Sequence, residues 1–247
     1  MIETADIRQP ERAVTGEAKG YSLHSLVTPP TPYHEQDGIR IFCGDNRVIA
    51  PTLGQYDCLH TDPPYGIGAD KNLRANKQHG KAAAPSRDYG VGQWDSATPE
   101  PWVLQMMMAK AKWQIIWGGN YFGLQGRRGW LVWDKDNGDN GYADCELAWT
   151  NLEIAVRKIR YKWQGMLQEN MAEKEVRWHP TQKATSVMEW ALGFVPECKT
   201  VLDPWMGSGT TLIAARARGM QADGIEINEQ YCEAAKRRLA QGVLLAV

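Results

Sequence analysis

A short proline-rich motif carries the clearest chemical signal in the chain. Asp62, Pro63, Pro64 and Tyr65 directly follow the apolar run 58–61. Consecutive prolines fix the backbone and have no N–H, so the loop is stiff and its carbonyl oxygens can accept hydrogen bonds. A carboxylate and such a carbonyl together can accept both hydrogens of an aromatic amine, which localises its lone pair, and Tyr65 can stack on a base at about 1–3 kcal/mol. The motif favours amine activation, although four residues alone are equally typical of a proline-rich turn.

A glycine-rich turn forms the second motif, between Asp203 and Thr211. No lysine follows its last glycine, which excludes a phosphate loop, and the third glycine of a dinucleotide fingerprint is missing. Asp203 suits a cationic amine, such as the amino group of a methionine moiety. Glu226 follows nineteen residues after Gly207, at the end of the next predicted strand, where an acid can accept both ribose hydroxyls. This spacing predicts a site for an adenosine-containing cofactor.

Taken together, the two motifs resemble the β class of DNA amino-methyltransferases, a permuted family in which Asp-Pro-Pro-Tyr precedes the cofactor motif. Residues 177–183 resemble the family's HPTQKP segment, and residues 43–45 resemble its Gly-Asp strand end; the resemblance spans about residues 39–239. This chain departs from the pattern at Trp205, where Phe is usual, and at Ala184, where Pro is expected. The resemblance implies catalytic roles for Asp62, Pro63, Pro64 and Tyr65, and S-adenosylmethionine binding by Asp45, Thr181, Lys183, Asp203, Trp205, Gly207, Ser208, Gly209, Thr210, Thr211, Glu226 and Asn228.

The activity implied by the resemblance is methyl transfer to N6 of adenine in double-stranded DNA after base flipping. Asp at position 62 favours adenine, because family members that act on cytosine N4 more often carry Ser. A cytosine-N4 enzyme and an inactive DNA-binding relative remain alternatives. Methyltransferases that act on RNA or on a protein amide usually carry Asn before Pro-Pro-Tyr and have the glycine motif first. This chain has Asp62 and the opposite motif order, which argues against those substrates. By analogy with the family we expect a homodimer, with any restriction nuclease on a separate chain.

Strand and helix patterns alternate from residue 39 onward. We expect strands at 39–43, 56–61, 113–117, 130–133, 146–149, 200–202 and 222–227, and helices at 99–112 and 209–218, with a last helix capped by Asn228. Such alternation predicts an α/β fold with a mostly parallel sheet. The family resemblance specifies a Rossmann-like, seven-stranded methyltransferase sheet in circularly permuted order.

Cationic charge gathers in two segments, although the net charge of the whole chain is -1. One lies in the long patternless stretch 66–95, which we expect to be a mobile loop. The other lies in residues 153–177, which we expect to be a small target-recognition insertion in a methyltransferase domain spanning 38–247. Charge runs are usually solvated faces, but these flank a catalytic motif. We therefore expect DNA contacts from Lys71, Arg74, Lys77, Lys81, Arg87, Arg157, Lys158, Arg160 and Lys162.

Composition narrows the remaining classes. The five cysteines form no CxxC pair, so we expect reduced thiols and no metal site. Neither a signal peptide nor an apolar run of membrane-spanning length occurs. We expect a cytoplasmic protein with no membrane partner. Residues 1–37 are expected to form a polar, partly disordered N-terminal arm.

Overall fold

The computed structural model describes residues 28–68, 95–138, 143–164, 167–172, 174–178 and 181–241. The strands are β1 (His34–Gln36), β2 (Ile39–Cys43), β3 (Tyr56–Thr61), β4 (Ala111–Trp117), β5 (Trp130–Asp134), β6 (Cys145–Thr150), β7 (Arg157–Arg160), β8 (Trp163–Gln164), β9 (Leu167–Gln168), β10 (Thr200–Asp203) and β11 (Gln221–Glu226). The α-helices are α1 (Asn46–Ile49), α3 (Pro101–Met108), α4 (Thr185–Leu192), α5 (Thr210–Ala217) and α6 (Glu229–Gln241), with single 3₁₀ turns at Ala50–Thr52 and Gly119–Tyr121.

Nine strands form one sheet in the order β1-β2-β11-β10-β3-β4-β6-β5-β7. Strands β2, β11, β10, β3 and β4 are parallel neighbours, whereas β6 runs antiparallel between β4 and β5. The seven expected strands are therefore present as β2, β3, β4, β5, β6, β10 and β11, and β1 and β7 extend the sheet at its two edges. The predicted Rossmann-like α/β class is confirmed, and the sheet is mostly parallel.

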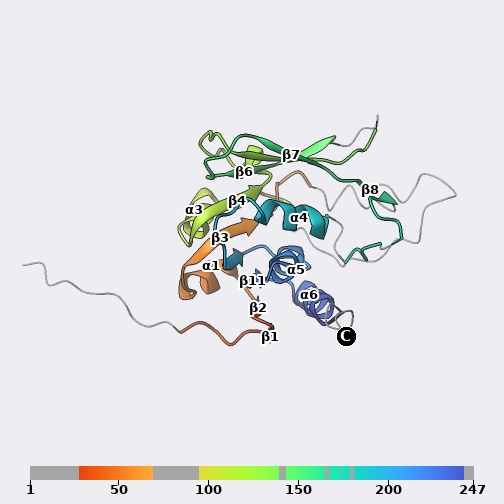
Figure 1. Ribbon diagram of the computed structural model, residues 1–247. Helices are drawn as coiled ribbons and strands as arrows, with labels where there is room; N and C mark the ends of the chain where they lie inside the picture. Colours follow the sequence, from red (N-terminus) through yellow and green to blue (C-terminus); the bar gives the residue numbers. More distant parts are fainter. Residues whose placement is uncertain are drawn as a thin grey trace, which may run out of the picture.

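Helices cover both faces of this sheet (Figure 1). Helices α4, α5 and α6 pack on one face, around a buried cluster that includes Ile41, Met188 and Leu212. Helices α1 and α3 lie on the other face, where Phe42 and Met107 belong to a second cluster. Layers of this kind leave the carboxyl ends of the parallel strands open, which is where ligands bind in such sheets. Within the described residues, no helix is both long enough and apolar enough to cross a bilayer.

Two element predictions were wrong at their ends. The helix predicted at 99–112 stops at Met108, and β4 already begins at Ala111, which pairs with Tyr56 of β3. The turn between them is held by the Lys110 ammonium, which donates to the carbonyl oxygens of Pro51 and Leu53. The predicted arm is also too long, because residues 34–36 pair with β2 as strand β1. Residues 1–27 lie outside the described part of the chain.

Candidate active site

Three strand ends with acidic residues meet at the carboxyl edge of the sheet. Asp203 is the last residue of β10 and Glu226 the last of β11, while Asp62 directly follows β3. Strands β3 and β10 are parallel neighbours, and the Thr61 hydroxyl donates to Asp203 Oδ1 over 2.7 Å. The two motifs, more than a hundred residues apart in the sequence, therefore share one hydrogen-bonded edge.

Asp62 belongs to a cluster of buried charges. Its Oδ2 accepts from the Lys183 ammonium at 2.6 Å, and its Oδ1 accepts from the Tyr65 hydroxyl at 2.6 Å. The same ammonium lies 2.8 Å from Glu146 Oε2 and donates to the Tyr65 oxygen at 3.0 Å. Glu146 is in turn paired with Lys135 at 2.5 Å. Two carboxylates and two ammonium groups thus balance one another at the end of the proline-rich motif.

Burial shifts the pKa values in this cluster. Burial and the Glu146 charge raise the pKa of Asp62, against the lowering influence of the Lys183 ammonium. For Glu146 burial also raises the pKa, but Lys183 and Lys135 outweigh it and hold the value at about 2. Burial lowers the pKa of Lys183, yet the two carboxylates dominate and raise it. Lys183 is therefore a firmly protonated cation, and Asp62 is the carboxylate whose proton affinity is enhanced.

The Tyr65 ring is held by aromatic and backbone contacts. Tyr121 stacks on it with centroids 4.9 Å apart and an interplanar angle of 15°, and Phe122 meets it edge-on. A side chain at Gly118 would place its Cβ 2.1 Å from Tyr65 Cε1, so only glycine allows this approach. Gly118 also has a φ of +68°, a conformation that glycine adopts without strain. The position of the Tyr65 ring is consequently set by residues 118–122, which follow β4.

The glycine-rich turn connects β10 to α5 and touches Glu226. The Gly207 N–H donates to Glu226 Oε2 and the Asn228 N–H donates to Oε1. Asn228 caps α6 as predicted, because its Oδ1 accepts from the Gln230 N–H. Ile227, between the two, is 72% exposed. An acid, an amide and an exposed apolar side chain thus lie side by side at the end of β11.

Asp203 is a buried carboxylate that lies among neutral donors. It is 2% exposed and accepts from the Thr61 hydroxyl and the Trp205 N–H. Burial raises its pKa to about 6, against the lowering effect of hydrogen bonds from Thr211 and Thr61. None of the ion pairs between described residues involves Asp203. A buried anion of this kind is stabilised by a cationic ligand, so Asp203 fits the amino group expected of the cofactor.

Two residues that were not among the predicted site residues hold the turn in place. Arg238 of α6 is 8% exposed, and its Nη1 donates to the Ser208 carbonyl and to the hydroxyls of Ser208 and Thr210. Gln182 accepts from the Ser208 hydroxyl, which ties the segment before α4 to the turn. The sequence does contain a signal for Arg238, since it lies three residues after Ala235 on the apolar face of the last helix.

Other predicted cofactor residues lie in different surroundings. Asp45 caps α1, accepting from the Arg47 backbone N–H, and also pairs with the Arg47 guanidinium at 2.6 Å. Thr181 is exposed. Lys183 was predicted with the cofactor residues, but its ammonium lies on Asp62. This difference arises because β3 and the segment before α4 meet in space, which the sequence spacing does not reveal.

The predicted DNA contacts divide into two groups. Lys71, Arg74, Lys77, Lys81 and Arg87 lie outside the described residues, as does most of the predicted loop 66–95. The ends of that loop meet, because Asp95 accepts from the Gly66 and Gly68 N–H groups.

The second group lies on and beside β7, within the predicted insertion 153–177. Arg157 is exposed, Lys158 pairs with Asp134, and Arg160 and Lys162 pair with Asp136. Since β7 is an edge strand of the main sheet, its cations also protect that edge from further strand pairing. This part of the predicted insertion therefore belongs to the sheet itself.

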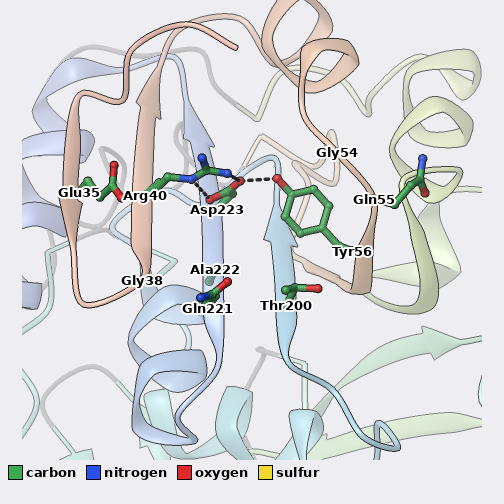
Figure 2. A pocket seen from close by; sticks show the side chains of 10 residues that line it. All are labelled: Glu35, Gly38, Arg40, Gly54, Gln55, Tyr56, Thr200, Gln221, Ala222 and Asp223. Atoms are coloured by element: carbon green, nitrogen blue, oxygen red, sulfur yellow. Dashed lines mark hydrogen bonds and ion pairs between the residues drawn. The ribbon is translucent and has the colours of Figure 1, made fainter. Parts of the chain in front are cut away.

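A cavity of about 340 Å³ lies at the opposite, amino edge of the sheet (Figure 2). Arg40 donates to both oxygens of Asp223 at 2.8 and 2.6 Å, and the Tyr56 hydroxyl donates to the same carboxylate. Asp223 and Arg40 are direct partners in the pairing of β11 with β2. These polar groups satisfy one another, and the glycine-rich turn lies at the other end of β10, so the cavity is not the candidate active site.

The fold and the carboxyl-edge site define a Rossmann-like α/β protein of the methyltransferase type. A model of the DNA methylase family, N6_N4_Mtase, matches residues 132–237. The type II methyltransferase M.ScaI of Streptomyces caespitosus is 42% identical over 258 aligned residues, covering 84% of this chain and 83% of that protein. The chain therefore belongs to the DNA methylase family.

Two further comparisons define the extent of the likeness. The type II methyltransferase M2.LlaDCHI of Lactococcus lactis subsp. cremoris is 36% identical over 87 residues, 35% of this chain, so the match spans about a third (32%) of that relative. The crystal structure of the M1.HpyAVI-SAM complex superposes with a TM-score of 0.52 at 21% identity, covering 81% of this chain and 98% of that one. At that identity the superposition shows the shared fold alone.

Proposed function

We propose that this chain transfers a methyl group from S-adenosylmethionine to the exocyclic N6 amino group of adenine in double-stranded DNA. The observation that carries the proposal is the hydrogen bond between Thr61 and Asp203, which joins the amine-activating motif to the cofactor motif. Family membership supplies the reaction class and the nucleic-acid substrate. The adenine assignment rests on Asp62 and is the finer part of the proposal.

The cofactor residues proposed are those at the ends of β10 and β11. Asp203 is a buried anion suited to the amino group, and the Glu226 carboxylate is suited to the ribose hydroxyls. Ile227, 72% exposed, offers an apolar surface beside them for the adenine ring. S-adenosylmethionine, when bound, supplies an electrophilic methyl group on a sulfonium.

The target amine is activated by two acceptors. Asp62 and the Pro63 carbonyl accept its two hydrogens, which draws the nitrogen toward a tetrahedral geometry and localises its lone pair. Methylation then makes the nitrogen cationic and strongly acidic, so its proton passes readily to Asp62, whose pKa is raised by burial. Asp62 therefore acts as a hydrogen-bond acceptor first and a proton acceptor afterwards.

The base must leave the duplex to reach Asp62, because the carboxylate is at the sheet edge and only 24% exposed. Flipping costs a few kcal/mol, and stacking on Tyr65 returns about 1–3 kcal/mol of it. Tyr121 now covers that ring at 4.9 Å, so we expect it either to move or to become part of the base-stacking surface. The cationic groups around β7 are the proposed contacts to the phosphate backbone.

The experiment is to methylate DNA with the purified chain, digest it to nucleosides and identify the methylated base by mass spectrometry. N6-methyladenine, formed only with the cofactor and absent with Asp62→Ala, is the expected product. N4-methylcytosine alone would overturn the adenine assignment and leave DNA methylation intact. Binding of both the cofactor and DNA without any methylated base would favour the inactive-relative alternative.

A further inference from the structure

Glu146 lies at the centre of the charge cluster although it belongs to neither motif. It is on β6, whose neighbours are β4 and β5, and its side chain is 20% exposed. A carboxylate in such a position is costly unless it is paired. Its partners are the ammonium groups of Lys183 at 2.8 Å and Lys135 at 2.5 Å, and the Tyr65 hydroxyl at 3.3 Å. Two of these three partners also contact Asp62.

Lys183 has three ammonium hydrogens, and the structure provides three acceptors for them. These are Asp62 Oδ2, Glu146 Oε2 and the Tyr65 hydroxyl oxygen, at 2.6, 2.8 and 3.0 Å. A lysine ammonium has no further donor once these are made. The ammonium therefore has a fixed location, 5.4 Å from the centroid of the Tyr65 ring.

An ammonium is a stronger hydrogen-bond donor to a carboxylate than a neutral aromatic amine. If Asp62 were its sole anionic partner, Lys183 would compete directly with the target amine for the same oxygens. Glu146 pairs with the same ammonium and so holds it to one side of Asp62. It also accepts from the Tyr65 hydroxyl, so Asp62 is not the sole anchor of that side chain either.

We propose that Glu146 is a positioning residue of the methyl-transfer site, which shares Lys183 and Tyr65 with Asp62 and so keeps acceptor capacity on Asp62 for the target amine. The inference deepens the proposed function and rests on it. Glu146 touches neither reacting group in this arrangement; it acts through Lys183 and Tyr65. Lys135 keeps Glu146 ionised from the other side.

The test compares Glu146→Gln, which removes the charge but keeps the shape, with Glu146→Asp, which keeps the charge. Asp144→Asn serves as the matched control, because Asp144 is an exposed acid just before β6. We expect Glu146→Gln to lower single-turnover methyl transfer about ten- to a hundredfold, the range for a misplaced reacting group. Cofactor affinity should stay within about twofold, Glu146→Asp should recover part of the rate, and Asp144→Asn should match the unaltered chain.

A pH titration separates positioning from a merely structural role. The charged and titratable groups that interact with Asp62 are Tyr65, Glu146, Lys183 and Asp203. His60 interacts with Lys183, and Lys135 lies behind Glu146. Glu146 raises the pKa of Asp62, and its removal also leaves Lys183 wholly to Asp62, so both changes lower that pKa. Because Asp62 must be ionised to accept, the acid limb of the rate profile should move to lower pH in Glu146→Gln.

Carbon-13 NMR of the Asp62 carboxyl group reports the same shift without turnover, with Asp62→Asn used for assignment. A rate loss with an unmoved acid limb and an unmoved Asp62 titration would overturn the inference, as would an unchanged rate. Failure of the proposed function is distinguishable, since the unaltered chain would then methylate no DNA at all.

Discussion

Each edge of the sheet holds an aspartate between a cation and a tyrosyl hydroxyl, yet the two arrangements differ in how the cation is shared. At the amino edge Arg40 binds both oxygens of Asp223 with two parallel hydrogen bonds. At the carboxyl edge Lys183 gives Asp62 one hydrogen bond and divides the rest between Glu146 and Tyr65. The planar guanidinium matches a single carboxylate, whereas a tetrahedral ammonium can be distributed among several acceptors.

This difference separates a structural ion pair at Asp223 from a site at Asp62 that can still accept hydrogen bonds. Both oxygens of Asp223 accept hydrogen bonds from its strand partner Arg40, and the carboxylate also accepts from Tyr56. Asp62 lies between two prolines and a strand end, where the turn after β10 and the segment before α4 also arrive. The same residue types therefore stabilise the fold at one edge and are available for chemistry at the other.

The largest effect expected from this comparison is on the rate of methyl transfer. Asp62→Ala should abolish turnover, a loss of about a thousandfold or more, while cofactor affinity stays within a few fold, because Asp62 is not among the proposed cofactor contacts. Asp223→Ala, the matched change at the amino edge, should retain methyl transfer. Rates and calorimetric affinities of the two variants decide the point, and turnover by Asp62→Ala would remove Asp62 from the mechanism.

For the free energy of unfolding we expect the clear effect at Asp223 and not at Asp62. Asp223→Ala leaves the Tyr56 hydroxyl and Arg40 without their shared acceptor, and we expect it to lower the free energy of unfolding by about 1–3 kcal/mol. The value is below that of a fully buried pair because the Arg40 side chain is 40% exposed. Urea denaturation measures it. A fall in turnover larger than the unfolded fraction explains would mean that the amino edge takes part in the reaction.

Much of the fold was predictable because the strands and helices alternate with clear breaks. The strand ends at 43, 61 and 226 were predicted to within a residue, and the edge on which they meet follows from parallel pairing. Glu146 could not be found in this way. It is one acid in a short strand of mixed character, and its partner Lys183 is 37 positions away in the sequence.

The position of the Lys183 ammonium also depends on tertiary contacts. Its place in a segment resembling HPTQKP predicted a cofactor role, and the position of its ammonium depends on β6 and β3, which no local pattern specifies. Arg238 illustrates the same limit, since an arginine on an apolar helix face indicates burial but not the turn that it holds. Motifs locate the strand ends, whereas the charged side chains that contact the site residues there come from other parts of the chain.

A further expected effect concerns Asp203, a carboxylate at the carboxyl edge that has no cationic partner among the described residues, unlike Asp62 and Asp223. With its pKa raised to about 6 by burial, the folded protein binds more protons than the unfolded chain between about pH 4 and pH 6. Without cofactor, stability should therefore fall as the pH rises through that window and level off above it. Asp203→Asn should remove this dependence and stabilise the cofactor-free protein at neutral pH by about 2–3 kcal/mol.

Cofactor binding should show the complementary behaviour, because a cationic amine favours the ionised carboxylate. Affinity of the unaltered chain should decrease as the pH falls below about 6, and Asp203→Asn should bind about ten- to a hundredfold more weakly at neutral pH. Thermal denaturation and calorimetry with S-adenosylmethionine across this pH range measure both trends, with Asp223→Asn as the control that should leave cofactor affinity unchanged. If Asp203→Asn gained stability but bound the cofactor as before, the buried charge would be a liability without a ligand, and the amino group would have to bind elsewhere on this edge.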